Sequence, residues 1–133
     1  MSTTHRKKVL VFIDWYLPGY KAGGPIPSVA NIVARLKNDF DFAIVTADTD
    51  AGETAPYPNI KSDEWNLLAD GTRVFYFSEK GKTFSALKKL ILSEQADVLY
   101  TNSLFSVFFT LYPLIIRKYF LRLGKKYFRI ING

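Results

Sequence analysis

The sequence has 133 residues, enough for one domain, and it is 48% hydrophobic and 16% aromatic, which excludes a disordered chain. It contains no cysteine and one histidine, so disulfide frameworks, cysteine nucleophiles and thiolate or histidine-rich metal sites are excluded. The net charge is +6, but no recognition helix, zinc finger or RNA-binding signature accompanies the basic residues, which argues against nucleic acid as a partner.

The chain begins with a polar leader, residues 1–7, that we expect to be flexible. It holds the histidine, His5, so a Ser-His-Asp triad would have to recruit a residue from this leader. The apolar run that follows at 9–13 is too short for a secretory signal. Together with the lack of cysteine, this favours a cytoplasmic protein.

A strand, a loop and a helix come next. The near-continuous apolar run 8–13 is rich in β-branched residues, which is typical of a strand covered on both faces of a parallel sheet. Residues 14–25 form a loop with two prolines and three glycines. Pro27 then suits the first turn of a helix whose apolar residues recur every three or four positions up to Leu36.

The middle of the chain predicts two further strands around a long polar excursion. Residues 42–46 form the second strand and residues 73–77 the third. The segment 47–59 contains glycine and prolines, and long loops in compact domains are more often functional than ordinary connectors. We expect a short helix at 62–68.

The last third alternates between helices and strands. Thr83 is placed to cap a helix, residues 97–101 form a fourth strand, and an unusually apolar helix extends from about 104 to about 123, where Gly124 ends it. Residues 126–131 form a fifth strand. Because strands alternate with helices, we predict an α/β fold, a Rossmann-like parallel sheet with helices on both faces.

The loop after the first strand is the main candidate site. Ligands of open parallel sheets bind outside the carboxyl ends of the strands, and this loop is long, aromatic and glycine-rich. Gly23 and Gly24 allow a ligand to approach the backbone, and the helix start favours an anion such as phosphate, although a glycine pair is also compatible with an ordinary tight turn. Dinucleotide and P-loop fingerprints are absent, which argues against nicotinamide and ATP.

Four segments, in order, resemble glycosyltransferase family 4, and more narrowly its bacterial members that build polysaccharides. The first is Pro18–Ser28, which follows a strand ending in Asp-Trp-Tyr. The others are residues 46–50 after the second strand, Glu64 and Trp65 in the excursion, and residues 100–106 after the fourth strand. The resemblance covers nearly the whole chain from about Lys8.

This resemblance implies a GT-B architecture, in which two Rossmann-like domains face each other across a cleft. Residues 8–133 would be the N-terminal, acceptor-side domain, truncated before the C-terminal donor-binding domain. The implied reaction transfers a sugar, with retention, from a UDP- or GDP-linked nucleotide sugar to a sugar or lipid-linked glycan in cell-surface polysaccharide synthesis, without a metal or other cofactor. The lack of a histidine in the first loop also favours retention. We expect the isolated chain to be inactive.

The resemblance also implies site residues. In the family the glycine loop reaches the donor phosphates, which points to Gly23 and Gly24, and Lys21 beside them is either a phosphate partner or a solvated lysine. The candidate acceptor-binding residues follow strands or lie in the excursion, and they are Asp14, Trp15, Tyr16, Trp65, Asn102 and Ser103. Each has a structural alternative, since aromatic rings pack in cores and polar residues cap loops and helices.

Two further alternatives stay open at the level of the sequence. Asp48 and Asp50 are spaced like a metal-binding pair, but we assign them cleft-edge or loop-capping roles. The apolar helix needs a cover on its outer face, namely the missing domain, a second copy or, as its basic residues favour, the inner membrane surface. The competing functions are a non-catalytic Rossmann or flavodoxin-like module that binds a nucleotide or a partner, and a small nucleotide-binding oxidoreductase.

Overall fold

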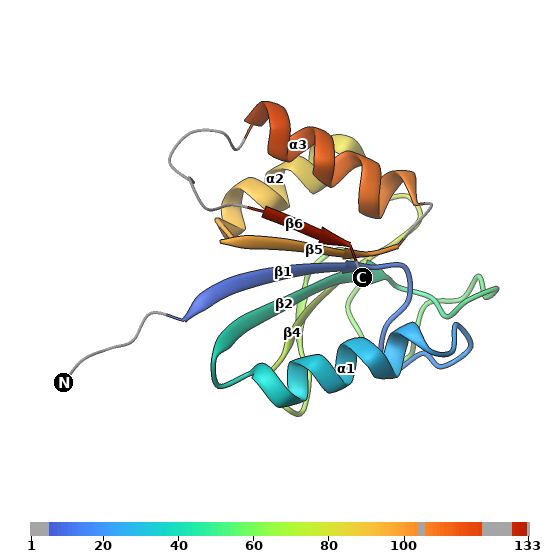
Figure 1. Ribbon diagram of the computed structural model, residues 1–133. Coiled ribbons are helices and arrows are strands. Elements are labelled where there is room, and N and C mark those ends of the chain that lie inside the picture. The colour runs from blue at the N-terminus through green and yellow to red at the C-terminus, as the bar shows by residue number, and fades with distance from the viewer. Residues whose placement is uncertain (1–5, 104–105, 121–128, 133) are drawn as a thin grey trace.

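The computed structural model describes residues 6–103, 106–120 and 129–132 and contains one six-stranded sheet with helices on both faces (Figure 1). The strands are β1 Lys7–Ile13, β2 Phe40–Ala47, β3 Trp65–Leu67, β4 Arg73–Phe77, β5 Val98–Asn102 and β6 Arg129–Asn132. The helices are α1 Pro25–Leu36, α2 Phe84–Glu94, the π-helical turn η1 Val107–Leu111 and α3 Tyr112–Phe120.

The sheet is mostly parallel, which confirms the predicted fold class. Its order is β3-β4-β2-β1-β5-β6, and only the pairing of β3 with β4 is antiparallel. The chain builds outward from β1 through β2 to β4, then crosses to β5 on the other side of β1. The carboxyl ends of β1 and β5 therefore flank the switch point, where open α/β sheets bind their ligands.

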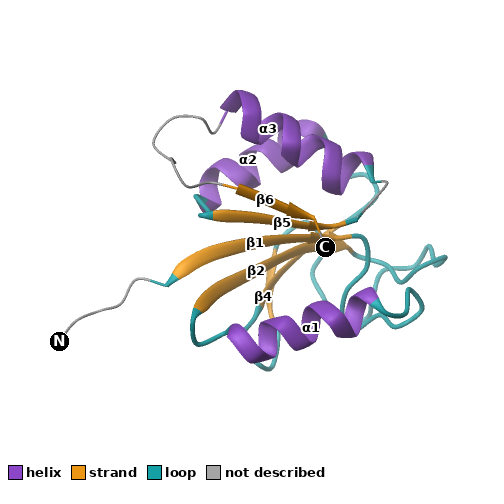
Figure 2. Cartoon of the chain, in the orientation of Figure 1, coloured by secondary structure: helices purple, strands orange, loops and turns teal. Residues whose placement is uncertain are grey.

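Two hydrophobic cores lie on opposite faces of this sheet (Figure 2). Leu10 and Phe12 of β1 face the core formed with α2, η1 and α3, whereas Val9, Val11 and Ile13 face the core formed with α1. Because both faces are covered, the strand has no polar alternation, and this explains its near-continuous apolar run.

The predicted short helix at 62–68 is wrong, since this segment contains strand β3. Trp65 lies opposite Phe75 of β4, with ring centroids 5.4 Å apart, and the guanidinium of Arg73 lies 4.5 Å from the Trp65 ring. These cross-strand contacts stabilise the extended conformation. A short local pattern does not reveal them, because the partner strand follows in the sequence.

The apolar helix is confirmed in its described part but begins with a π-helical turn. The amides of Thr110 and Leu111 both donate to the carbonyl of Ser106, and α3 follows with Pro113 as its second residue. The wider turn accommodates Pro113, whose ring clashes with the carbonyl four residues earlier in a regular α-helix. The predicted ends of this helix and the start of the fifth strand at 126–128 lie outside the described residues. Within the described ranges, no helix is long and apolar enough to cross a membrane.

Candidate functional site

Asp14 and Ser103, two of the predicted site residues, meet at the carboxyl edge of the sheet. Strands β1 and β5 pair in parallel with Ile13 opposite Asn102. The next residue on each strand, Asp14 and Ser103, therefore leaves the sheet at the switch point. The pairing of β1 with β5 brings these two residues together although they are 89 positions apart in the sequence (103 − 14). This agrees with the prediction that residues after parallel strands lie at one edge of the sheet.

Asp14 lies in an environment that disfavours its charged form. Burial raises the pKa of this half-buried carboxyl, and the Ser103 hydroxyl, the Ser106 hydroxyl and the Lys82 ammonium group act in the opposite direction without cancelling the effect. A carboxyl group whose charged form is destabilised by its surroundings is typical of a functional site.

Ser103 supplies a hydroxyl that is buried and unpaired. The residue is 5% exposed, and among the described residues its Oγ has no hydrogen-bond partner of good geometry. Although the hydroxyl is near enough to influence the Asp14 pKa, it falls short of a hydrogen bond to the carboxylate. Buried polar groups are normally paired, so an unpaired hydroxyl at a ligand-binding edge is a candidate contact for a ligand.

Ser106 and Lys82 complete this cluster, and the sequence did not single out either residue. The Ser106 hydroxyl caps η1 by accepting from the Phe109 amide at 2.9 Å. The Lys82 ammonium group lies 5.5 Å from the centroid of the Phe109 ring and 3.4 Å from a carboxylate oxygen of Glu79. Lys82 follows β4 in a Gly-Lys-Thr turn, and its place after a strand was the signal that could have identified it.

The first loop is held in place by Asp50, in agreement with its predicted loop-capping role. The Asp50 carboxylate accepts from the backbone amides of Tyr20 at 3.1 Å, Lys21 at 3.1 Å and Ala51 at 2.8 Å. Burial acts to raise the pKa of Asp50, but these amides together outweigh it and hold the pKa below the usual value. Asp48 has a similar local role, because it accepts from the Ser62 hydroxyl at 2.7 Å.

Two buried tyrosines donate hydrogen bonds to backbone carbonyls of the same loop. The Tyr57 hydroxyl donates to the Tyr16 carbonyl at 3.2 Å, and the Tyr76 hydroxyl donates to the Leu17 carbonyl at 2.6 Å. Burial raises the pKa of Tyr76 to about 12, so its hydroxyl remains a donor at neutral pH. Gly19 packs against this layer so closely that a Cβ atom there would lie 2.2 Å from the Tyr57 hydroxyl.

The aromatic residues predicted to stack on sugars have other positions. Tyr16 is 2% exposed and packs in the core on the α1 side, so it supports the loop instead of offering its ring to an acceptor. Trp15 is partly buried against the same core. Trp65 lies on the edge strand β3, three strands from β1, and therefore belongs neither to the Asp14 cluster nor to the loop.

The start of α1 offers fewer amides than the sequence suggested. Pro25 and Pro27 have no N–H group, and the Ile26 amide donates to the Gly23 carbonyl at 3.2 Å. The Gly23 amide is also occupied, by the Tyr20 carbonyl at 3.1 Å. Among residues 23–27, Gly24 has the one amide without a partner in the described chain, so this stretch of the predicted phosphate site keeps a single backbone donor.

The two glycines differ in the reason for their presence. Gly23 has a φ of 77°, which favours glycine by itself. Gly24 has a φ of −49°, which any residue adopts. Both are exposed, and a Cβ atom on either would meet nothing within 4 Å. No contact in the described chain therefore requires glycine at position 24.

The remaining predicted residues are engaged locally. Lys21 is exposed and forms an ion pair with Glu53, and the hydrogen bond to this carboxylate raises the pKa of Lys21. A phosphate would have to compete with Glu53 for this lysine. The Asn102 side-chain amide lies 3.5 Å from the Tyr100 hydroxyl and is partly buried beside Ser103.

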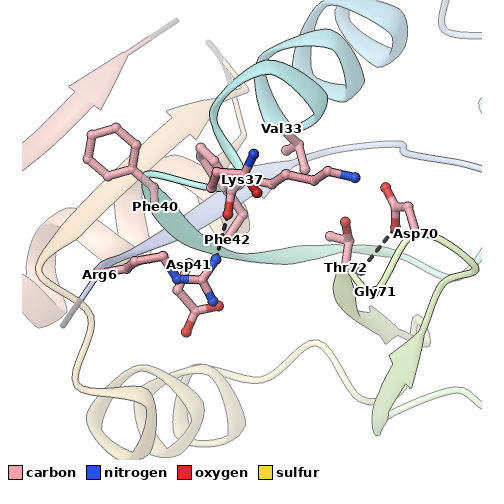
Figure 3. A pocket seen from close by; sticks show the side chains of 10 residues that line it. Arg6, Val33, Lys37, Phe40, Asp41, Phe42, Asp70, Gly71 and Thr72 are labelled. Carbon is pink, nitrogen blue, oxygen red and sulfur yellow. Dashed lines mark hydrogen bonds between the residues drawn. The ribbon is translucent and has the colours of Figure 1, made fainter. Parts of the chain in front are cut away.

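Two hollows lie at opposite edges of the sheet. One, with a volume of 480 Å³, opens at the carboxyl ends of β2 and β4 and is lined by Asp48, Glu53, Lys80 and Lys82 among others. The second, with a volume of 220 Å³, lies at the amino ends of the strands (Figure 3). There the Arg6 guanidinium donates to the Lys37 carbonyl at 2.5 Å, which caps α1. Because ligands of open α/β sheets bind at the carboxyl ends of the strands, this hollow at the amino ends is not a candidate ligand site. The residues that line it, such as Arg6, stabilise the fold.

Comparisons with known proteins do not identify the chain. No protein-family model matches the sequence, and no curated protein or solved structure gives a significant match. Within residues 6–103, 106–120 and 129–132, no group of three or more His, Cys, Asp or Glu side chains is placed to hold a metal ion.

Proposed function

We propose that this chain is the acceptor-side, N-terminal domain of a retaining glycosyltransferase that uses a UDP- or GDP-linked sugar in cell-surface polysaccharide synthesis. The resemblance of its loops to glycosyltransferase family 4 motivates the proposal. The observation that supports it most is the polar cluster of Asp14, Ser103, Ser106 and Lys82 at the switch point.

This cluster has the chemistry to hold a sugar hydroxyl. The Asp14 carboxylate accepts a hydrogen bond from the hydroxyl, and the buried Ser103 Oγ gains the partner that it lacks among the described residues. The positive charge of Lys82 acts to lower the pKa of Asp14 and so favours its carboxylate form. In a retaining transfer, such residues contribute by positioning the acceptor oxygen against the donor, so a strong base is not required.

Gly24 is the proposed point of contact with the donor. It lies in the first loop, its amide is unpaired within the described chain, and the space above it is open. A phosphate of the nucleotide sugar, held mainly by a second domain, approaches this amide at the helix start. Lys21 is a weaker candidate for the same contact because Glu53 already pairs with it.

Binding of simple glycosides to the ¹⁵N-labelled chain tests the acceptor part of the proposal. We expect methyl glycosides at millimolar concentrations to perturb the amide signals of Asp14 and Ser103, and Ser103→Ala to weaken this binding. The matched control is Thr46→Val, since Thr46 Oγ1 is likewise buried and unpaired but lies in β2. Equal binding by the two variants, or the absence of any glycoside response, contradicts the proposal.

A non-catalytic module that binds a nucleotide or a partner is the second candidate. The prolines in the first turn of α1 favour its partner-binding form, because they remove two of the donors that a phosphate-binding loop normally uses. The same titrations distinguish the candidates. UDP or GDP binding at the carboxyl edge without any glycoside response supports the module, whereas a glycoside response at Asp14 supports the transferase.

A further inference from the structure

A further hollow lies between the first loop and the segment that follows β2, and we call it the tyrosine hollow. Its volume is 360 Å³, and its lining is mainly proline and tyrosine, including Pro18 and Tyr20 from the first loop and Pro56 and Tyr57 from the other segment. This volume lies in the range of pockets that hold small molecules, about 300–1,000 Å³.

The ring that is most open to a ligand in this hollow belongs to Tyr20. Tyr20 is 75% exposed, whereas Tyr57 is 8% exposed and uses its hydroxyl to hold the Tyr16 carbonyl. An exposed tyrosine ring beside proline rings offers a flat apolar surface on which the ring of a ligand can pack.

The charged groups that line the hollow are two carboxylates. Asp50 is occupied by the backbone amides of Tyr20, Lys21 and Ala51. Glu53 pairs with Lys21 through Oε1, and its Oε2 makes no hydrogen bond within the described chain. A carboxylate has about four acceptor sites, so Glu53 can still accept from a hydroxyl of a ligand.

This lining favours a neutral ligand that has both an apolar face and hydroxyl groups. None of the described residues that line the hollow is Lys or Arg, so its carboxylates disfavour an anion such as a nucleotide. A wholly apolar ligand would remove Glu53 from water without giving it a partner. A pyranose fits both features, because its axial C–H groups form an apolar face and its hydroxyls donate at the rim.

The tyrosine hollow adjoins the cluster that is proposed to hold the acceptor. Glu53 and Pro56 line both this hollow and the 480 Å³ hollow at the carboxyl ends of β2 and β4. Lys82 also lines the 480 Å³ hollow, and it lies near enough to Asp14 for its charge to act on that carboxyl. The two hollows therefore extend from the Asp14 cluster to the first loop.

The two walls of the tyrosine hollow are already joined without a ligand. Asp50 binds the amides of Tyr20 and Lys21, and the Tyr57 hydroxyl donates to the Tyr16 carbonyl. These bonds connect the first loop to the segment after β2. A ligand that enters between them has less backbone to order, which favours binding.

We propose that the tyrosine hollow binds a further pyranose ring of the acceptor, stacked on Tyr20 and donating a hydroxyl to Glu53. The acceptor is then an oligosaccharide whose reacting ring lies at Asp14 and whose preceding rings follow the two hollows. This inference rests on the proposed transferase function, because it takes the sugar in the hollow to be part of the acceptor.

Titration of the ¹⁵N-labelled full chain with methyl β-glucoside and with cellotetraose tests the proposal. These sugars are suitable because all ring substituents of β-glucopyranose are equatorial, which leaves C–H groups on both faces. We expect cellotetraose to perturb the amide signals of Tyr20 and Glu53 as well as those of the Asp14 cluster. Its affinity should exceed that of methyl β-glucoside at least about fivefold, since linked rings bind in adjoining sites.

Variants of Tyr20 locate the contact. Tyr20→Ala is expected to weaken cellotetraose binding about three- to tenfold, whereas Tyr20→Phe, which keeps the ring, should remain within about twofold of the wild type. The matched control is Tyr119→Ala, because Tyr119 is also exposed, at 61%, but lies on α3. Both positions are exposed, so melting curves of these variants should match that of the wild type.

The outcomes separate this inference from the proposed function. A response of the Asp14 cluster alone, with equal affinity for one ring and four, overturns the inference and leaves the proposed function standing. A response of Tyr20 and Glu53 alone keeps the hollow as a sugar site but contradicts the proposed acceptor cluster. Equal loss of binding in Tyr20→Ala and Tyr119→Ala also overturns the inference, and no response to either sugar contradicts both proposals.

Discussion

At the scale of single residues, identical side chains have different reasons for their positions in the candidate site. Gly19 is required by close packing, Gly23 by its backbone conformation, and Gly24 by neither. The carboxylates differ as well, because burial raises the pKa of Asp14 whereas backbone amides lower that of Asp50. Asp50 stabilises the loop in its charged form, and Asp14 is disfavoured in that form. This contrast motivates the proposal that Asp14 contacts a ligand, whereas Asp50 holds the first loop through its hydrogen bonds.

Gly19→Ala is expected to destabilise the domain by about 1–3 kcal/mol, because the new methyl group overlaps the Tyr57 hydroxyl and the Asp50 carboxylate. Gly24→Ala is the control, since its Cβ atom meets nothing, and a cost below about 1 kcal/mol is expected. Urea denaturation gives both free energies of unfolding. A similar loss of unfolding free energy in the two variants would contradict the close packing of Gly19 against Tyr57 and Asp50.

Asp14→Asn is expected to raise the thermal stability at neutral pH. A carboxyl whose pKa is raised on folding contributes stability that is fully present below its unfolded pKa and is lost as the pH rises through its folded pKa. The wild type therefore falls behind the variant as the pH rises above about 4, the range of the unfolded carboxyl pKa. Melting curves across this range measure the difference, and a variant that is less stable at pH 7 would contradict the raised pKa.

The opposite sign is expected for Asp50→Asn. A carboxyl whose pKa is lowered on folding contributes stability that is present above its unfolded pKa and is lost as the pH falls through its folded pKa. The variant should thus be less stable than the wild type at neutral pH, and the difference should shrink below about pH 4. The same melting curves test this prediction. A difference in stability that is constant at every pH would show that the substitution acts through the shape of the side chain and not through the charge of the Asp50 carboxylate.

At the scale of elements, the long apolar and alternating segments were predictable from the sequence, and features that depend on distant partners were not. The strands around residues 8–13 and 42–46 follow from burial on both faces. The edge strand β3 and the π-helical turn were missed, because one depends on cross-strand rings and the other on how Pro113 fits a helix.

The candidate site divides in the same way. Asp14 and Ser103 were predictable because strand ends of a parallel sheet meet at one edge. Lys82 could have been identified by its place after β4. The tyrosine supports could not, because their contacts join segments that are 41 and 59 residues apart and no strand-end rule connects them.

Tyr76→Phe is expected to loosen the first loop without disturbing the sheet. The change removes the 2.6 Å hydrogen bond to the Leu17 carbonyl and costs about 1 kcal/mol or slightly more. Amide hydrogen exchange should accelerate at residues 19–24, while β1 stays protected. The comparison is Tyr57→Phe, which removes a longer bond of 3.2 Å to the neighbouring Tyr16 carbonyl. Uniform acceleration across β1 and the loop would show global destabilisation instead.

At the scale of the whole molecule, the two faces of the sheet have different surroundings. The α1 face meets the first loop, and the opposite face is covered by α2, η1 and α3 (Figure 1). Ser106, the N-cap of η1, lies beside Asp14, and α3 follows η1 in the chain. The apolar helix therefore starts beside the cluster that is proposed to hold an acceptor.

The expectation from the sequence that the inner membrane surface covers the apolar helix makes a prediction about which positions leave water. The chain contains no cysteine, so a single introduced cysteine takes one environment-sensitive fluorophore. A label at Val107→Cys, where the side chain is 56% exposed, is expected to shift to shorter wavelength and brighten on anionic vesicles, because it enters the interface. A label at Asn31→Cys, exposed on α1, should not respond, since α1 covers the opposite face. A label at Gly24→Cys should also stay in water, as the first loop must remain open to a donor. If the Asn31 label responds as strongly as the Val107 label, the chain binds lipid without a preferred face, and the orientation is wrong.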